Sequence, residues 1–204
     1  MSHHKDIKLT AEDVTMEPNH RWQRLWIVFA GVGLLGLALS FVLKSYGAKG
    51  QLAYSYLVAF MFFLSIALGG LFFVLIQVAG KAGWSVVVRR IAEICMATLP
   101  LFLLLFIPVY LGMHELYHHW LDKAAVASDP ILRHKSPWLN EPFFLVRSAV
   151  YLVAWAGLSF YFYRQSVLQD AGGKPDITRR LQIASAPGII IFAITVSFAA
   201  FDWM

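Results

Sequence analysis

Five long apolar blocks constrain the fold of this chain more than any other feature of its sequence. They lie at about residues 25–43, 56–79, 94–112, 143–163 and 181–201. Each is close to the roughly 20 helical residues that cross the hydrocarbon core of a bilayer. Only 14% of the residues are charged, against roughly 25% in soluble domains. The sequence therefore predicts an all-α integral membrane protein: a polar tail at residues 1–24, then a polytopic bundle of about five transmembrane helices at residues 25–204.

The distribution of lysine and arginine predicts how this bundle is oriented. Eleven of these residues lie in the tail and in the second and fourth connections, whereas five lie in the first and third connections. Because positive residues are retained in the cytoplasm, the N-terminus is predicted to be cytoplasmic and the loop at 113–142 to face outward. Arg147, just inside the fourth span, can snorkel outward. The lysines and arginines behind the net charge of +5 flank the apolar blocks, as membrane topology requires. The net charge therefore gives no indication of nucleic-acid binding.

The segment WSVVVRRIAE at residues 84–93 carries charges into the third apolar stretch. Glu93 follows Arg89 by four residues and Arg90 by three, so both pairs can form on one helix face. Three interpretations stay open: an interfacial cluster that reaches anionic headgroups, pairing between helices, and proton transfer by Glu93. An ionisable group at this depth costs several kcal/mol unless it is paired or wetted. Asp202, at the end of the fifth span, is either an interfacial acid, or a buried partner of another side chain or a member of a proton path.

Prolines and glycines predict the local shape of the bundle. The third span belongs to a predicted helical stretch from Trp84 to Gly112 that contains Pro100 and Pro108. Each proline removes one intrahelical hydrogen bond and can bend the helix. The pair Gly69-Gly70, in the middle of the second span, is predicted to let another helix approach closely.

A literal H-E-x-x-H motif stands at the outer end of the third span, at His114-Glu115-Leu116-Tyr117-His118. On a helix this spacing places two imidazoles one turn apart beside a carboxylate, as in zinc hydrolases. A catalytic zinc also needs a third protein ligand, and no neighbouring residue stands in a recognisable third-ligand pattern. A zinc hydrolase is therefore a distant alternative, and neither a metal ligand nor a catalytic residue is predicted. With His119, these histidines are predicted to form an outward polar patch.

Four stretches of the sequence carry a resemblance to a known family. They are YLVAFMFFLSIALGGLFFVLIQ at 56–77, GWSVVVRRIAEICMATLPLFLLLFIPVYLGMHELYHHW at 83–120, DPILRHKSPWLNEPFFLVR at 129–147 and SFAAFDWM at 197–204. The recurring motifs are W-S-V-V-x-R-R-x-A-E, L-Y-x-x-W, K-S-P-x-L-N-x-P-F-F and D-W-M. Together they resemble the second quinone-binding-type membrane subunit (ActF) of alternative complex III, a bacterial quinol:electron-acceptor oxidoreductase related to NrfD-like polysulfide reductases.

The resemblance implies an accessory subunit of a respiratory complex in the bacterial cytoplasmic (inner) membrane. It implies a helical scaffold with a proton route, for which the candidates are Glu93, Arg89, Arg90 and Asp202. It implies no redox cofactor in this chain and a quinone or quinol at the interface with a paralogous membrane subunit. The other expected partners are lipid, further membrane subunits, and outer iron–sulfur and c-type haem subunits that dock near His114, His118 and His119. A pure assembly and anchor subunit is the alternative.

The resemblance also implies that the chain is the front half of a larger subunit. Family members are about twice as long and continue into a further half-bundle after D-W-M. The sequence from Ala199 to Met204 has no polar tail after its last apolar block, which fits the same expectation.

Overall fold

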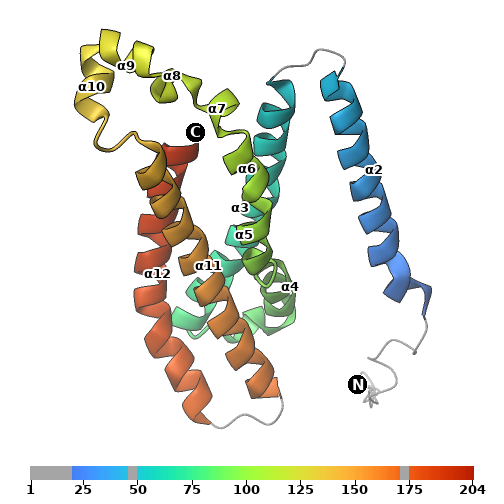
Figure 1. Ribbon diagram of the computed structural model, residues 1–204. Helices are drawn as coiled ribbons and strands as arrows, with labels where there is room; N and C mark the ends of the chain where they lie inside the picture. Colours follow the sequence, from blue (N-terminus) through green and yellow to red (C-terminus); the bar gives the residue numbers. More distant parts are fainter. Residues whose placement is uncertain (1–19, 46–49, 171–174) are drawn as a thin grey trace, which may run out of the picture. The chain divides into compact units, whose positions relative to one another are not determined.

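The computed structural model describes residues 20–45, 50–170 and 175–204, so most of the tail predicted at residues 1–24 lies outside the described part. Throughout these ranges the regular elements are helices, and none is a strand. Five helical stretches are long and apolar enough to cross a membrane: Arg21–Ser40, Gln51–Ala79, Val88–Leu111, Glu141–Asp170 and Asp176–Trp203. The predicted all-α, multi-pass membrane fold is thus confirmed (Figure 1).

The chain divides into two units, residues 1–49 and 50–204. The first contains the 3-10 turn η1 (Arg21–Arg24) and helix α2 (Leu25–Ser45). Large apolar side chains of α2, such as Trp26 and Phe29, are exposed. Lipid tails are as apolar as these side chains, so a membrane-spanning helix can carry them on its surface.

The second unit contains three long helices, α3 (Gln51–Ala79), α11 (Glu141–Asp170) and α12 (Pro175–Trp203). Shorter elements run between α3 and α11: η2 (Gly83–Ser85), α4 (Val86–Met96), η3 (Leu99–Leu101), α5 (Phe102–Leu105), α6 (Ile107–Leu111), α7 (Met113–Leu116), α8 (His118–Leu121), α9 (Lys123–Ser128) and α10 (Pro130–Lys135). Figure 1 shows α7 to α10 at the end of this unit where the chain terminates.

The third span is a series of short helical pieces, as its two prolines predicted for the stretch from Trp84 to Gly112. Pro100 has no N–H to give to the carbonyl of Met96, four residues earlier. That carbonyl instead accepts a hydrogen bond of 2.6 Å from the Ser159 hydroxyl of α11. The break in the helix thus creates a bond to a neighbouring helix, because a freed carbonyl inside the bundle needs a donor.

The predicted outward loop at 113–142 contains four short helices, α7 to α10. Two aspartates begin the last two of them. Asp122 Oδ1 accepts a hydrogen bond of 2.9 Å from Ala124 N–H, and Asp129 Oδ1 accepts one of 2.8 Å from Ile131 N–H. Aspartate is a favoured N-cap because its carboxylate satisfies a free backbone donor of the first turn.

Helices α3 and α4 approach each other closely at Gly70. A Cβ atom at this position would lie 2.6 Å from the carbonyl oxygen of Ala92 and 3.0 Å from Cys95 Cβ. A Cβ at the neighbouring Gly69 would meet nothing within 4 Å. The predicted close approach at Gly69-Gly70 is therefore confirmed at Gly70, whereas Gly69 does not take part in it.

This contact predicts a difference between two adjacent alanine variants. We expect Gly70→Ala to destabilise the bundle by about 1–3 kcal/mol, because the added methyl group meets backbone atoms and forces the helices apart. Gly69→Ala is the matched control, and we expect it to be neutral or stabilising by up to about 1 kcal/mol, the helix preference of alanine over glycine. Thermal unfolding of both variants in detergent measures the difference. Equal melting temperatures for the two would contradict the packing at Gly70.

An aromatic cluster fills the core near the C-terminus. Trp203 is 2% exposed. Its indole contacts the rings of Phe60, Phe106, Tyr151 and Trp155 at centroid distances of 6.0, 5.5, 6.2 and 5.8 Å. Since these rings come from α3, the third span and α11, Trp203 joins α12 to the rest of the second unit.

Candidate functional site

Glu93 lies on α4 with only 1% of its side chain exposed. Its Oε1 accepts a hydrogen bond of 2.8 Å from Arg89 Nε, and its Oε2 lies 2.9 Å from Arg90 Nη1. Arg90 also contacts the Asp170 carboxylate at the end of α11. Both oxygens of Glu93 are thus paired with cations, which offsets the cost of burying a carboxylate.

The same arginines connect α4 to α11 and α12. Arg89 Nη2 donates to Ser166 Oγ at 3.1 Å and to Gln169 Oε1 at 3.3 Å. Gln169 Nε2 in turn donates to Thr178 Oγ1 of α12 at 2.7 Å. Among the three interpretations of the charged segment, these contacts favour pairing between helices. They do not decide on proton transfer. We refer to this group as the Glu93 cluster; its members are Arg89, Arg90, Glu93, Ser166, Gln169 and Asp170.

A cavity of about 220 Å³ adjoins the Glu93 cluster and is lined by its six members. Since water occupies about 30 Å³ per molecule in the liquid, the cavity has room for several water molecules. Water there would contact the guanidinium groups and the carboxylates directly. Glu93 is therefore buried by protein but lies beside a polar cavity that has room for water.

A second buried ion pair joins α11 to the end of α12. Arg147 Nε and Nη2 donate to Asp202 Oδ2 and Oδ1 at 2.7 and 2.8 Å, and the Tyr151 hydroxyl donates to Oδ2 at 2.8 Å. The two charged side chains are only 8% and 4% exposed. Asp202 is thus a buried partner of Arg147 and Tyr151. The expected outward snorkelling of Arg147 is wrong, because a bidentate carboxylate within the protein satisfies its guanidinium.

Two aromatic rings hold the Arg147 guanidinium in place. Its Cζ lies 4.4 Å from the centre of the Trp138 ring and 4.5 Å from that of Phe143. Arg147 Nη1 also donates to the Trp138 carbonyl at 2.9 Å. Cation–π contacts of desolvated groups stabilise by up to about 2 kcal/mol. The segment before α11 thus closes over the ion pair, which we name, with Tyr151, the Asp202 cluster.

Tyr117 connects the segment of α7 to α10 to the same region. Its hydroxyl donates to the Trp203 carbonyl at 3.1 Å. Burial, and then the negative charge of Asp202, raise the pKa of the Tyr117 phenol to about 12. The phenol therefore stays protonated at neutral pH and remains a hydrogen-bond donor.

The two clusters lie on one face of α11. Arg147 and Ser166 are separated by about 28 Å along this helix at 1.5 Å per residue, close to the roughly 30 Å of a hydrocarbon core. The buried residues between them, on the same face, are Ser148, Tyr151, Leu152, Trp155, Ser159 and Phe162. Most of these are apolar or aromatic, so each cluster is a separate polar site in an otherwise apolar face.

The histidine motif does not lie on one helix. Helix α7 ends at Leu116, and Tyr117 adopts φ −120° and ψ 28° before α8 begins at His118. The spacing that would place two imidazoles on one turn is therefore lost. His114, His118 and His119 are all exposed at this break, which fits a surface patch.

The side chains of the described ranges offer no group of three or more histidines, cysteines or acidic residues that could hold a metal ion.

An apolar groove of about 300 Å³ lies between α3 and the third span. It is lined by Phe63, Ile66, Ala67, Cys95, Thr98, Leu101, Phe102 and Leu105. Thr98 donates its hydroxyl proton to the Cys95 carbonyl at 2.7 Å. The groove therefore suits a hydrocarbon chain better than a polar headgroup.

Compared with known protein families and with curated proteins, the chain matches no family and no curated protein. The fold and the geometry of the two clusters are therefore what constrains the function.

Proposed function

We propose that the chain is a membrane subunit of a bacterial respiratory quinol:electron-acceptor oxidoreductase of the alternative complex III type. Its role is that of a helical scaffold and a proton-conducting element in the cytoplasmic membrane. The observation that carries this proposal is Glu93, a carboxylate buried in a membrane-spanning segment between two arginines and beside a polar cavity. Ionisable residues inside membrane spans are costly and mark ion paths or proton relays.

The geometry suggests how protons would reach the site. Glu93 lies at the end of the bundle that the positive-inside rule predicts to be cytoplasmic. Movement of Arg89 or Arg90 would open the carboxylate to water in the cavity, and at that step Glu93 takes up or releases a proton. Asp202 serves the opposite end, where Arg147 and Tyr151 hold it.

The remaining parts of the proposal concern partners. The chain carries no redox cofactor, and quinone or quinol binds at its interface with a paralogous membrane subunit. Iron–sulfur and c-type haem subunits dock on the outer side, near the exposed patch of His114, His118 and His119.

Substitution of Glu93→Gln in the assembled complex tests the proton-conducting role. We expect proton release and quinol oxidation per complex to fall at least tenfold, because glutamine keeps the shape but cannot transfer a proton. Glu141→Gln, at the start of α11, is the control for removal of an acid outside the two clusters. Unchanged proton release and unchanged quinol oxidation in Glu93→Gln would remove Glu93 from the mechanism.

A pure assembly subunit is the second candidate, and one observation favours it. In the part of the chain that the structure describes, every buried side-chain nitrogen and oxygen has a hydrogen-bond partner. Fully satisfied polar networks fix one arrangement of helices. In that case, substitutions at Arg89, Arg90 and Glu93 would lower the yield of the complex and leave its turnover per complex unchanged.

A further inference from the structure

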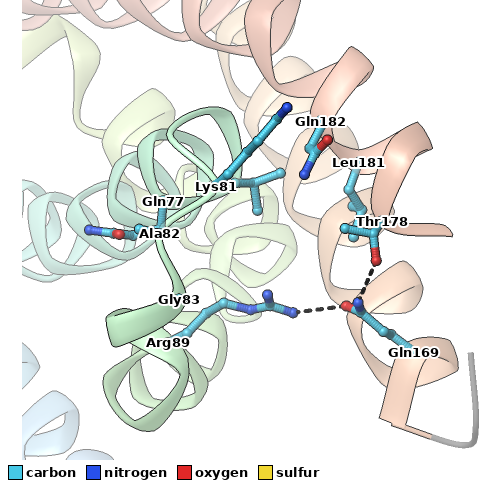
Figure 2. Close-up of a pocket in the computed structure, with 10 residues that line it drawn as sticks. Gln77, Lys81, Ala82, Gly83, Arg89, Gln169, Thr178, Leu181 and Gln182 are labelled. Atoms are coloured by element: carbon cyan, nitrogen blue, oxygen red, sulfur yellow. Dashed lines mark hydrogen bonds between the residues drawn. The ribbon is translucent and has the colours of Figure 1, made fainter. Parts of the chain in front are cut away.

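A second polar cavity, of about 180 Å³, lies beside the Glu93 cluster and shares Arg89 and Gln169 with it. It sits where α3 ends and where α4, α11 and α12 meet. Figure 2 shows Lys81 and Arg89 reaching from the side of α3 and α4 toward the helices that carry Gln169, Thr178 and Gln182. The whole lining is Gln77, Val78, Lys81, Ala82, Gly83, Arg89, Gln169, Thr178, Leu181 and Gln182.

The charge of this lining has one sign. Lys81 and Arg89 are its charged members, and no acidic residue takes part. Arg89 turns its Nε to Glu93 and its Nη2 to α11, which fixes the guanidinium at the wall of the cavity. Lys81 is exposed and forms no salt bridge with any residue of the described ranges. Since Arg89 shares its charge with Glu93, the positive charge at the cavity that the described residues leave unpaired is that of Lys81, and this charge favours an anion.

The backbone around Lys81 contributes to this arrangement. Lys81 has φ 51°, in the left-handed region, which is uncommon for residues other than glycine, asparagine and aspartate. Its N–H donates to the Val78 carbonyl at 3.3 Å, and the next N–H, of Ala82, donates to the Gln77 carbonyl at 3.1 Å. The turn is thus held by backbone bonds, and a lysine occupies a position where a glycine would be less strained.

The neutral members of the lining also suit an oxyanion. The carboxamide of Gln182 is half-buried and offers N–H donors without adding charge. Thr178 and Gln169 hold each other through their hydrogen bond. Val78 and Leu181 are buried apolar residues at the same cavity, so polar donors and apolar surface meet there.

We propose that this cavity binds a phosphate group at the membrane surface. The cavity volume of about 180 Å³ equals that of about six water molecules, which is enough for a phosphate group. Basic pockets between transmembrane helices on the cytoplasmic side bind anionic lipid headgroups. The phosphate belongs either to an anionic phospholipid or to free phosphate. The apolar residues beside the donors favour the lipid. This inference goes beyond the proposed function and does not depend on it.

The test uses the full chain purified in detergent. Native mass spectrometry and thermal unfolding are recorded with phosphatidylglycerol, with phosphatidylcholine of the same acyl chains, and with inorganic phosphate. Lys81→Asn removes the charge while retaining a residue that tolerates the left-handed backbone. Gln182→Glu keeps the side-chain shape and brings a negative charge into the cavity. Lys123→Asn, at the start of α9, is the matched control for loss of a lysine.

We expect phosphatidylglycerol to bind and to raise the melting temperature, with phosphatidylcholine weaker. Lys81→Asn should weaken binding of phosphatidylglycerol about fivefold, the effect of about one lysine near a membrane surface. Gln182→Glu should weaken it at least as much, and Lys123→Asn should not change it. If inorganic phosphate binds the wild type and the two cavity variants reduce that binding, the phosphate site is supported and its source is the soluble ion. Equal binding of both lipids, or equal binding by wild type and both cavity variants, overturns the proposal.

Discussion

Replacement of Arg147 by methionine is expected to destabilise the protein by about 3–5 kcal/mol, the usual cost of removing one partner from a buried ion pair. Asp202 would keep only the hydrogen bond from Tyr151, in surroundings where its side chain is 4% exposed. The rings of Trp138 and Phe143 would also lose the cation between them. Thermal unfolding in detergent, or loss of folded protein after mild heating, measures the effect.

A double variant separates the charge effect from packing. In Arg147→Met/Asp202→Leu no charge is left unpaired, and well-packed apolar replacements of buried ion pairs are often neutral. We expect the double variant to be more stable than Arg147→Met alone. Arg133→Met, at an exposed position of α10, is the control for loss of an arginine. A double variant that loses the sum of both single effects would contradict a coupled pair.

Removal of the Trp203 indole by Trp203→Ala is expected to cost about 3–5 kcal/mol, as for other fully buried aromatic side chains. Its ring contacts four aromatic side chains. Its Nε1 donates to Ser148 Oγ at 2.9 Å, and this hydroxyl is buried. The substitution therefore opens a cavity and removes the donor from a buried oxygen.

Phe201→Ala is the matched control, because Phe201 lies two residues earlier on α12 and is 86% exposed. We expect its melting temperature in detergent to stay close to that of the wild type. A similar loss in both variants would show that the end of α12 tolerates neither change, and the specific role of the Trp203 contacts would be refuted.

The course of the spans could be predicted because each depends on local composition. An apolar block of about 20 residues has few alternatives to a membrane helix, and each of the five predicted blocks overlaps one of the five helical stretches. The prolines identified the third span as irregular. The donor that satisfies the Met96 carbonyl at its break is Ser159 on α11, and no local pattern contains this partner.

The site could be predicted only in part for the same reason. Spacing along one helix was enough to place Arg89 and Arg90 beside Glu93. The partners on α11 are about 80 residues away in the sequence, so spacing could not identify them. Arg147 and Asp202 were each noticed as single charges near the ends of spans. That they pair follows from α11 and α12 lying side by side, which Figure 1 shows.

The histidine motif illustrates the opposite case, in which a sequence pattern loses its meaning in three dimensions. H-E-x-x-H requires a continuous helix for its two imidazoles to share a face. Tyr117 interrupts that helix and instead directs its hydroxyl to the end of α12. The pattern therefore coincides with a structural junction between the segment of α7 to α10 and the three long helices.

Affinity isolation of the chain from its native membrane tests its proposed role as a subunit of a quinol-oxidising complex. We expect the chain to isolate with proteins that carry iron–sulfur clusters and c-type haem, and we expect the isolated assembly to oxidise quinol. Haem absorbance, iron content and quinol oxidation are measured on the same sample. Isolation of the chain without haem or iron, together with unchanged quinol oxidation by membranes that lack the chain, would contradict the account.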